Sequence, residues 1–448
     1  MSLHLDNSLA RSDLGLEFID RAILKFEDVC LKERGSIISG PFGSNIGKKF
    51  FVEEGIPVIR GNNISEKFEL FKDYGFVFVS ESKAQELGTW AIEDDLIFTA
   101  AGTLGQVGII PKIRRFDRYI ISNKQIRARI DKTKILPLFA FIWFKTGRMI
   151  EYIKSRNTGS TIPLINLRVI RSLPIPAPPL PEQNQIVKIV MSLYNKIELN
   201  EKMNKTLEAI AQAIFKHWFI DFEFPDENGK PYKSSGGEMV DSELGKIPKG
   251  WMVSNIGREL TTVLGGTPST NKKDYWNGGN IPWINSGKIN EFRIIKPSAY
   301  ITPEALTNSA TKMMPKGTTV LAITGATLGK VSRIEVDMCA NQSVIGIIEN
   351  QLLPSEFIYF WVKSNIDYLI LNQTGGAQQH INKENVNELR ILIPSKEIMN
   401  KYIRMIKVMF DKISLSSFEE DDLSAIRNLL LPKLMTGKIR VPLEDEYE

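Results

Sequence analysis

The sequence of 448 residues has little of what metal-dependent and nucleophilic enzymes need. It contains two cysteines and three histidines, and His4, His217 and His380 are far apart with no Cys or His cluster near them. This excludes zinc sites of recognised spacing, and the lack of a histidine at a plausible base position disfavours a Ser-His-Asp triad. Cys30 and Cys339 are expected to be buried small side chains rather than a disulfide.

Other catalytic signatures are also missing. The segments 43–49 (GSNIGKK) and 325–331 (GATLGKV) resemble a phosphate-binding P-loop, but each has three residues rather than four between its glycines and no Ser or Thr after the lysine. No Asn-Pro-Pro-Tyr/Phe tetrapeptide of adenine methyltransferases occurs, and Pro225-Asp226 is not followed within thirty residues by the Asp/Glu-x-Lys of a nuclease. We therefore expect no catalytic residue, no metal ligand and no cofactor in this chain.

No apolar run approaches the roughly 20 residues that a membrane-spanning helix needs. The first residues, MSLHLDNSLARSDLG, also lack the apolar stretch and the small-residue cleavage site of a secretory signal. With 43% hydrophobic and 24% charged residues there is ample material for packed cores. These features predict a soluble cytoplasmic protein.

The sequence contains an internal repeat. Residues 99–105 read TAAGTLG and residues 323–329 read ITGATLG, and I56-P-V-I-R-G-N-N-I64 similarly matches I281-P-W-I-N-S-G-K-I289. Further matches follow in the same order: S122-N-K-Q-I126 with A340-N-Q-S-V344, then T158-G-S-T161 with T374-G-G-A377. The period of about 220 residues is too long for a solenoid unit and is typical of one domain with a connector. The chain is therefore predicted to be a tandem duplication.

The sharpest periodicity occurs after the Pro-rich segment 177–183, where apolar and polar positions follow an unbroken 4-3 alternation. The seam is Ile186, Val190, Leu193, Ile197, Asn200, Asn204, Leu207, Ala211, Ile214 and Trp218. Shifted by 216, the second seam is Tyr402, Ile406, Met409, Ile413, Ser416, Glu420, Leu423, Arg427, Leu430 and Leu434. Two amphipathic helices packed on their own domains are the plain alternative. Because both seams are polar at the centre, we favour an antiparallel coiled coil whose centre fixes the register and whose helices act as a spacer.

The predicted fold class is α+β, a tandem duplication of a β-rich domain followed each time by a long helix. Short β-branched runs such as 76–79, 96–98, 319–323 and 343–348 alternate with Gly and Asn turns. The predicted domains are 20–178 and 249–394, the predicted helices lie in 179–222 and 395–440, and the polar segment 223–248 is predicted to be a flexible linker.

Positive charge is concentrated in residues 112–134, which hold nine Lys or Arg against two Asp, whereas the whole chain is only +5. Such an excess is unusual for a solvated face, and Arg127 and Arg129 would leave one face of a strand and could follow phosphates or meet guanine edges. In the second repeat the basic residues are more scattered. The predicted DNA-binding residues are Lys48, Lys49, Arg60, Asn62, Asn63, Arg114, Arg115, Lys124, Arg127, Arg129, Asn285, Ser286, Lys288 and Lys330.

The chain resembles the specificity subunit of type I restriction-modification enzymes over nearly its whole length. The sequence motifs on which the resemblance rests are G40-PFGS44 with G55-IPVIRGNNI64, T374-GGAQQHIN382, P178-PLPEQNQI186 and E243-LGKIPKGW251. The resemblance implies two target recognition domains that read a bipartite double-stranded DNA target, held apart by a coiled coil. It implies no catalytic centre in this chain, two methyltransferase subunits that use S-adenosylmethionine, and nuclease/translocase subunits that use ATP and Mg²⁺. The first repeat departs from the pattern, with T158-GSTIPLIN166 in place of TGGAQQHIN and N123-K-Q in place of N341-Q342.

A target made of two separated parts needs two readers, which would explain the duplication. The loops common to both repeats are then expected to be structural turns, with Gly102, Gly105, Gly325 and Gly329 serving the backbone. Two alternatives remain open from the sequence. One is the DNA-reading subunit of a related system whose partner fuses nuclease and methyltransferase, and the other is a duplicated adaptor that binds no DNA.

Overall fold

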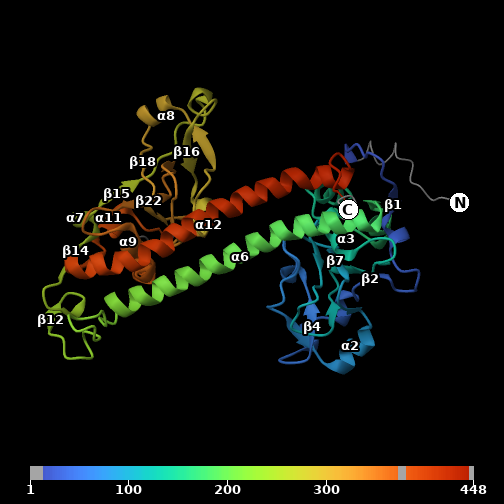
Figure 1. Ribbon diagram of the computed structural model, residues 1–448, viewed down its shortest axis with the longest axis horizontal. Helices are drawn as coiled ribbons and strands as arrows, with labels where there is room; N and C mark the ends of the chain where they lie inside the picture. The colour runs from blue at the N-terminus through green and yellow to red at the C-terminus, as the bar shows by residue number, and fades with distance from the viewer. Residues whose placement is uncertain (1–13, 372–379, 443–448) are drawn as a thin grey trace. The chain divides into compact units, whose positions relative to one another are not determined.

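The computed structural model describes residues 14–371 and 380–442. Contacts divide the chain into two compact units, which we call unit 1 (residues up to 197 and from 422 on) and unit 2 (198–421). Each unit contains one β-rich domain and parts of two long helices, labelled α6 and α12 (Figure 1). None of the described helices combines the length and the apolar character that a membrane-spanning segment requires.

Unit 1 contains two larger sheets of short strands besides the two-stranded pair β1-β11. One has the order β2-β10-β7-β8 and the other β3-β5-β4-β9-β6, in which β4 and β9 run parallel. The strands are β1 (Ile23–Lys25), β2 (Ile37–Ser39), β3 (Phe51–Val52), β4 (Ile56–Ile59), β5 (Val77–Val79), β6 (Trp90–Ala91), β7 (Leu96–Thr99), β8 (Val107–Ile109), β9 (Tyr119–Ile121), β10 (Gln125–Ala128) and β11 (Pro174–Pro176). The helices are η1 (Phe26–Val29), η2 (Gly43–Asn45), η3 (Lys48–Phe50), η4 (Gly61–Asn63), α2 (Glu81–Leu87), α3 (Pro137–Phe144), α4 (Gly147–Ser155), α5 (Leu167–Ser172) and α6 (Leu180–Phe219), whose second half lies in unit 2.

Unit 2 repeats this plan, with larger sheets of order β15-β22-β19-β20 and β17-β16-β21-β18, the two-stranded pair β14-β23, and again one parallel pair, β16 with β21. It also contains the hairpin β12-β13. Its strands are β12 (Met239–Ser242), β13 (Gly245–Pro248), β14 (Met252–Asn255), β15 (Thr261–Leu264), β16 (Ile281–Ile284), β17 (Ala299–Ile301), β18 (Met313–Met314), β19 (Thr319–Ala322), β20 (Val331–Arg333), β21 (Met338–Ala340), β22 (Val344–Ile348) and β23 (Arg390–Ile393). Its helices are α7 (Ile256–Glu259), η5 (Lys273–Tyr275), η6 (Ser286–Asn290), α8 (Pro303–Thr307), η7 (Gly325–Thr327), α9 (Ser355–Ser364), α10 (Ile366–Leu371), α11 (Lys383–Glu388) and α12 (Lys396–Thr436), which ends in unit 1. The predicted duplication and fold class are confirmed.

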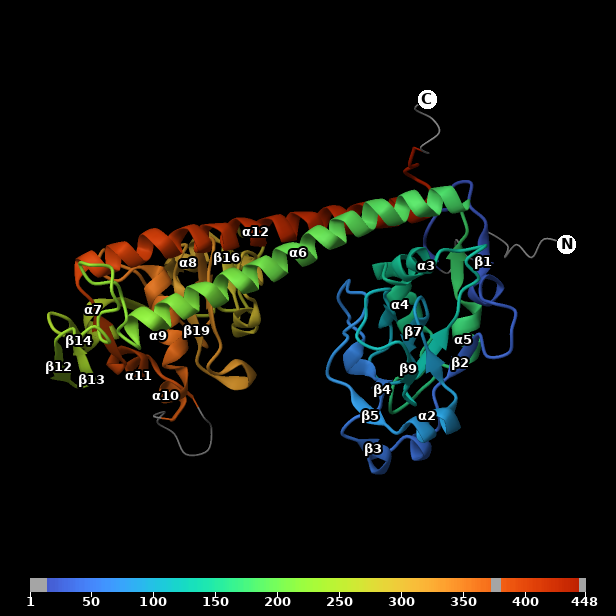
Figure 2. The same cartoon turned by 60° about the horizontal axis from the view of Figure 1, so that its bottom comes forward.

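One helix in each unit, α3 or α9, links the long helices to the sheet. Residues 139–144 of α3 are all buried, and so are residues 355–362 of α9. A short helix that is buried on all sides is suited to a place between two layers. Figure 2 shows α3 between α6 and β7, and the core of unit 1 joins side chains of α3, β7 and α6. Each β-rich domain is therefore anchored to the helices through a dry core.

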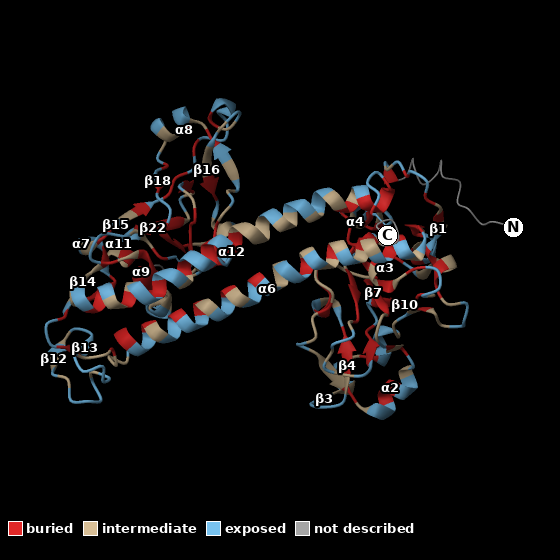
Figure 3. Ribbon diagram, viewed as in Figure 1, coloured by how far each residue is buried: buried red, intermediate tan, exposed pale blue. Residues whose placement is uncertain are grey.

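The helices α6 and α12 pair antiparallel, as the heptads predict. In unit 1 Ile186 and Val190 share a core with Leu434, and in unit 2 Trp218 shares one with Tyr402. Buried and exposed segments alternate along both helices (Figure 3), and none of the predicted seam residues is exposed. The 40 residues of α6 correspond to about 60 Å of helix at ~1.5 Å per residue.

The segment 223–248 is not the flexible linker that its composition predicts. It contains the hairpin of β12 and β13, and the ring of Phe224 stacks on Tyr232 (4.6 Å between ring centroids) and on Trp251 (4.9 Å). Phe224 and Ile247 belong to the core of unit 2. Scattered aromatic residues anchor this segment, and they produce no periodicity that a sequence pattern would detect.

Backbone hydrogen bonds also correct the sequence match between the repeats. The N–H of Ser122 donates to the carbonyl of Ile59 (2.9 Å), and the N–H of Asn341 donates to that of Ile284 (2.9 Å). Because Ile59 and Ile284 are matched, Asn341 takes the place of Ser122 and not of Asn123. The partner of Asn123 in the second repeat is therefore Gln342.

The two glycine loops match only at their ends. Ala100 donates its N–H to the carbonyl of Lys124, as Ile323 does to that of Ser343, so Ala100 is equivalent to Ile323 and the second loop is one residue longer. Gly102, Gly105, Gly325 and Gly329 all have positive φ. At Gly105 and Gly329 a β-carbon would lie 2.9 and 2.7 Å from side-chain atoms of α4 and α10. These glycines therefore have the structural role that the repeated loops predict.

Candidate nucleic-acid interface

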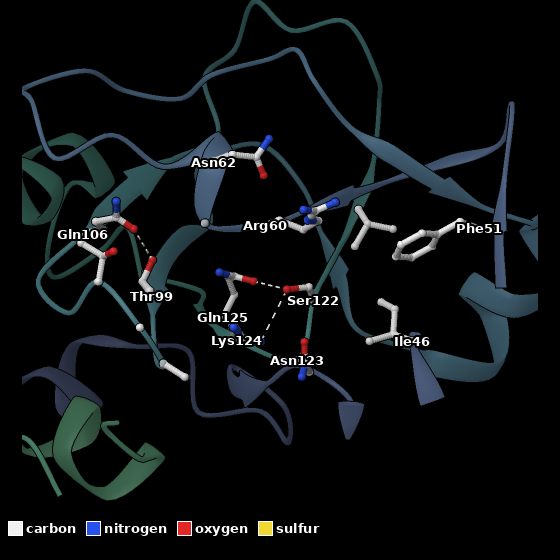
Figure 4. A pocket seen from close by; sticks show the side chains of 15 residues that line it. Ile46, Phe51, Arg60, Asn62, Thr99, Gln106, Ser122, Asn123, Lys124 and Gln125 are labelled. Atoms are coloured by element: carbon white, nitrogen blue, oxygen red, sulfur yellow. Dashed lines mark hydrogen bonds between the residues drawn. The ribbon is translucent and has the colours of Figure 1, made fainter. Parts of the chain in front are cut away.

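A polar pocket of about 440 Å³ lies in unit 1 where β4, β7, β9 and β10 end (Figure 4). Three segments contribute its polar side chains: Arg60 and Asn62 from the turn after β4, Thr99 and Gln106 from the two sides of the glycine loop, and Asn123 and Lys124 from the turn between β9 and β10. No aspartate or glutamate lines it. A hollow with cationic and amide groups and no carboxylate is suited to a ligand that carries negative charge and hydrogen-bonding edges.

The turn that presents Arg60 and Asn62 is held by Asn63. The Asn63 amide donates to the carbonyls of Lys72 (3.1 Å) and Tyr74 (2.9 Å), and its oxygen accepts from the N–H of Arg60 (3.0 Å). Asn63 is fully buried, whereas Arg60 and Asn62 are exposed. The prediction that Asn63 contacts DNA is therefore corrected, because all its polar atoms serve this turn.

Two hydrogen bonds order the rest of the pocket (Figure 4). The hydroxyl of Thr99 donates to the side-chain oxygen of Gln106 (2.9 Å), which leaves the Gln106 amide N–H groups for a ligand. The hydroxyl of Ser122 is hydrogen-bonded to the buried Gln125. The exposed side chains of Asn123 and Lys124 thus lie on a turn that the hydrogen bond between Ser122 and Gln125 holds in place.

The basic segment 112–134 is largely neutralised. Arg127 has only 5% of its side chain exposed, and it lies 3.7 Å from Asp95 and donates to the carbonyl of Gly35. Arg129 makes two 2.9 Å hydrogen bonds to the same carboxylate, and Arg114 pairs with Glu93 at 2.8 Å. Burial lowers the pKa of Arg127. The prediction that Arg127 follows phosphates is corrected, since Asp95, which is distant in sequence, holds its guanidinium inside the domain.

Other predicted cations are more available. Lys48, Lys49, Arg60 and Lys124 are exposed, and among the described residues none of them has a carboxylate within 4 Å. The side chain of Arg115 lies 5.4 Å from the ring of Phe116. Lys124 and Arg60 line the same pocket, and Lys48 and Lys49 belong to the short helix before Phe51, which also lines it. The structure therefore groups four of the predicted basic residues around one surface.

In unit 2 the corresponding turn after β16 carries Asn285, Ser286 and Lys288. Asn285 is exposed, Ser286 is partly exposed, and Lys288 pairs with Glu291 at 2.7 Å. Lys330 is exposed and occupies the place of Gln106. These residues lie at the same strand ends as the pocket of unit 1.

Four further exposed or partly exposed side chains at these strand ends are not among the predicted site residues. They are Phe42, Gln106, Asn123 and Gln342. Phe42 is 84% exposed, in the loop that packs beside Asn123, where a β-carbon on Gly43 would lie 3.0 Å from the Asn123 amide. Their positions at the ends of matched strands are the signal that could have found them, but this signal requires the exact match between the repeats.

At the centre of the seam, amide side chains meet carboxylates. The Asn200 amide donates to Glu419 and the Asn204 amide donates to Glu420, both at 2.8 Å. Asn204 and Glu420 are the same position of the two seams, so the helices meet at matched positions. This is the polar centre that the two heptad patterns predict.

The helices also pack on their own β-rich domains, so the plain alternative for them holds as well. Glu208 is buried beside the seam, and it accepts hydrogen bonds from Arg293 (3.0 Å), Tyr359 (2.9 Å) and Lys363 (2.6 Å) of its own unit. Burial would raise the pKa of Glu208, but Arg293 and Lys363 keep it below its ordinary value. In unit 1, Glu182 pairs with Arg21 (2.7 Å) and Arg440 (3.4 Å).

Two copies of a β-rich domain, each carried by an antiparallel pair of helices, define a duplicated protein with two polar surfaces. The family model described as the type I restriction modification DNA specificity domain matches residues 23–209 and 248–422. The chain therefore belongs to this family, as its sequence motifs predict. The segment 374–379, which is part of one of those motifs, lies outside the described residues.

Two relatives cover most of the chain. The specificity subunit of the type I restriction enzyme MjaIX of Methanocaldococcus jannaschii is 26% identical over 92% of this chain and 93% of its own length. The specificity subunit of the type I restriction enzyme HindI of Haemophilus influenzae is 28% identical over 72% of this chain and 82% of its own. The crystal structure of the S subunit of a type I restriction-modification system from M. genitalium has the same fold, with a TM-score of 0.57 at 13% identity over 93% of this chain and 96% of that one.

Proposed function

We propose that this chain is the sequence-specific DNA-recognition subunit of a type I restriction-modification complex. Residues 20–178 and 249–394 are its two target recognition domains, and each reads one part of a bipartite target. The helices α6 and α12 hold the readers apart and set the spacing between the two parts. Within this complex the chain has no catalytic role of its own.

The observation that carries the proposal is the duplication of a polar surface at matched strand ends, which in unit 1 is lined by no carboxylate. In unit 1 this surface contains Arg60, Lys124, Gln106 and Asn123. Cations on such a surface neutralise phosphates, while amides can read base edges. We assign Lys48, Lys49, Arg60, Lys124 and Lys330 to phosphate or guanine contacts, and Asn62, Asn285 and Ser286 to contacts with bases or sugars. Arg114, Arg115, Arg129 and Lys288 remain candidates for the rim.

The proposed partners are two methyltransferase subunits, which use S-adenosylmethionine to methylate adenine, and nuclease/translocase subunits, which use ATP and Mg²⁺. One feature of α12 supports protein partners. Met405, Val408 and Leu415 are 41%, 69% and 68% exposed, and their spacing places them on one face of the helix. An apolar stripe of this kind on an otherwise polar helix is suited to a protein surface.

The experiment that tests the proposal replaces residues 249–394 with the matching domain of a relative and maps methylated adenines in cells that contain the whole complex. We expect one half of the methylated target to change and the other half to stay the same, because each reader makes its own contacts. A parallel replacement of residues 20–178 should change the opposite half. If both halves change together in either variant, or if neither changes, the proposal of two independent readers is wrong.

A further inference from the structure

The exact match between the two units makes their exposed side chains comparable one by one. Equivalent backbone hydrogen bonds align the ends of β2, β4, β7 and β9 with those of β15, β16, β19 and β21. Several exposed or partly exposed positions at these ends differ between the units. Asn62 corresponds to Gly287 and Lys124 to Ser343, and four further positions carry a different side chain in each unit. The pairs, unit 1 first, are Phe42 and Thr267, Arg60 and Asn285, Gln106 and Lys330, and Asn123 and Gln342.

The framework beneath these positions is alike. Ile64 and Ile289 are both 2% exposed directly after the two matched turns. Trp143 and Trp361 are equivalent buried residues, and each donates its indole N–H to a backbone carbonyl, that of Pro174 (2.7 Å) or that of Arg390 (2.9 Å). The apolar frame is thus alike at these places, although the polar residues of the turns differ: Asn63 corresponds to Lys288, and the Ser122–Gln125 pair corresponds to Asn341 and Val344.

Position 42/267 differs most in chemistry. Phe42 is 84% exposed, which is unusual for a phenylalanine ring next to a polar pocket, whereas the hydroxyl of Thr267 is hydrogen-bonded to the side chain of Gln342. Covering a phenylalanine ring removes apolar surface from water and is favourable, so an exposed ring gains from a partner that covers it. In DNA such partners are the thymine methyl group and the faces of bases at a deformable step.

The other positions differ in charge and in hydrogen bonding. The amide of Gln106, held by Thr99, offers donors, and Lys330 offers a charged donor at the same place. Arg60 can donate two hydrogen bonds to one guanine, whereas Asn285 can both donate to and accept from one adenine. Each unit thus presents its own set of base-reading groups on a common frame.

We infer that these four positions are the main specificity determinants of the two readers, and this inference rests on the proposed function. Reader 1 uses an apolar ring, a guanidinium and amide donors, and reader 2 uses a hydroxyl, amides and an ammonium group. Lys124 and the shared glycine loops are outside this set, because the first is suited to phosphate and the second are common to both readers. The determinants are thus four side chains and not the whole domain surface.

The test transfers the four side chains of reader 1 to reader 2 in the full chain. The variant carries Thr267→Phe, Asn285→Arg, Lys330→Gln and Gln342→Asn, is expressed with its methyltransferase partners, and is assayed by mapping methylated adenines. We expect the half-site of reader 2 to move toward that of reader 1, while the half-site of reader 1 is unchanged and serves as an internal control. A complex that still methylates the original target overturns the inference.

A matched control carries Thr261→Phe and Lys383→Gln, two exposed positions of unit 2 outside the proposed surface: Thr261 begins β15 at the end opposite Leu264, and Lys383 lies in α11. This control should keep the original target. If replacing 249–394 changes the half-site while the four substitutions do not, the inference fails and the proposed function stands. If neither changes it, the proposed function fails.

Single substitutions cover the case in which the fourfold variant does not assemble. Phe42→Thr and Gln106→Lys each alter one exposed or partly exposed side chain of reader 1. Their affinities would be measured on duplexes that carry every single-base change of the mapped half-site. We expect each variant to lose roughly 10-fold discrimination at one base pair and little elsewhere. Equal weakening on all duplexes would mean that the residue only adds affinity, and it would overturn the inference for that position.

Discussion

Lys145 and Lys363 occupy equivalent places in the two units, two residues after Trp143 and Trp361, but they have different surroundings. Lys145 is buried and donates to the carbonyls of Ser65 and Lys67 (2.8 Å to the latter), whereas Lys363 pairs with Glu208 of α6 at 2.6 Å. Burial lowers the pKa of Lys145 to about 8. One lysine position therefore stabilises a loop in unit 1 and the joint to a helix in unit 2.

The difference extends to the whole joint between reader and helix. In unit 2, Glu208 has three donors, and its partner Arg293 also lies 3.6 Å from Glu335. In unit 1, Arg21 has one carboxylate partner among the described residues, Glu182. The apolar core between the β-rich domain and the long helices is thus similar in the two units, whereas the charged residues around it differ. The β-rich domains show the same pattern, with a similar framework and different exposed side chains. Close packing restricts substitutions of buried apolar residues, whereas an ion pair can be replaced when both of its partners change together.

The largest effect expected from this comparison is on the stability of unit 1. Glu182→Gln leaves the buried guanidinium of Arg21 without a carboxylate, and breaking a buried pair in this way costs about 3 kcal/mol or more. Glu208→Gln should cost less in unit 2, because Arg293 keeps Glu335. Hydrogen exchange of the full chain, followed separately for peptides of each unit, measures both losses without assuming a two-state transition. An equal or larger loss for Glu208→Gln would contradict the comparison.

A smaller effect is expected on the salt dependence of DNA binding. Lys124 of unit 1 is equivalent to Ser343 of unit 2, so only reader 1 has a cation at this turn. Lys124→Ser should lower the slope of log K against log salt by about 0.9, and Ser343→Lys should raise it by about 0.9, since each phosphate contact contributes this amount on duplex DNA. Lys132→Ser is the control, because Lys132 is already paired with Asp94 at 2.6 Å. Unchanged slopes for Lys124→Ser would remove this turn from the phosphate contacts.

Much of the fold could be predicted from the sequence because it depends on local patterns. The heptads gave the paired helices, and Asn204 and Glu420 meet at the centre as their spacing predicts. The buried, unpaired cysteines Cys30 and Cys339 also agree with expectation. The similar offsets between the repeats predicted the duplication. The sequence match between the loops 99–105 and 323–329 is wrong by one residue at their start. The second loop has one extra residue, and this insertion does not disturb the visible pattern of glycines.

The site was less predictable because it depends on contacts between distant residues. Arg127 looks like a surface cation in its basic segment, but Asp95, directly before the neighbouring strand β7, and the carbonyl of Gly35 hold it inside the domain. Asn63 looks like its neighbour Asn62, but the carbonyls of Lys72 and Tyr74 commit it to a turn. Composition counts charges without their partners, so it overestimated the exposed positive charge of the segment 112–134. It also gives no weight to uncharged residues such as Phe42 and Gln106.

The smallest expected effect concerns the centre of the helix pair, where matched positions carry an amide on α6 and a carboxylate on α12. Burial and the neighbouring charge of Glu201 raise the pKa of Glu420 to about 7, against the opposing hydrogen bond from Asn204; Glu419 adds to the rise and Lys205 opposes it. Because this pKa is higher in the folded than in the unfolded chain, the stability that Glu420 contributes is present below about pH 4.5 and is lost as the pH rises through about 7.

Glu420→Gln cannot ionise and keeps an oxygen for the Asn204 amide. The variant should therefore match the parent at pH 4.5 and exceed it at pH 8 by on the order of 1 kcal/mol, a value reduced from the full shift because water screens this partly exposed site. Hydrogen exchange of α12 peptides at several pH values measures the difference, and Glu201→Gln should move the loss of stability in the parent to lower pH by removing one repelling charge. A difference that is the same at pH 4.5 and pH 8 would mean that folding does not raise the pKa of Glu420, and that at neutral pH the polar centre of the pair is an amide facing a charged carboxylate.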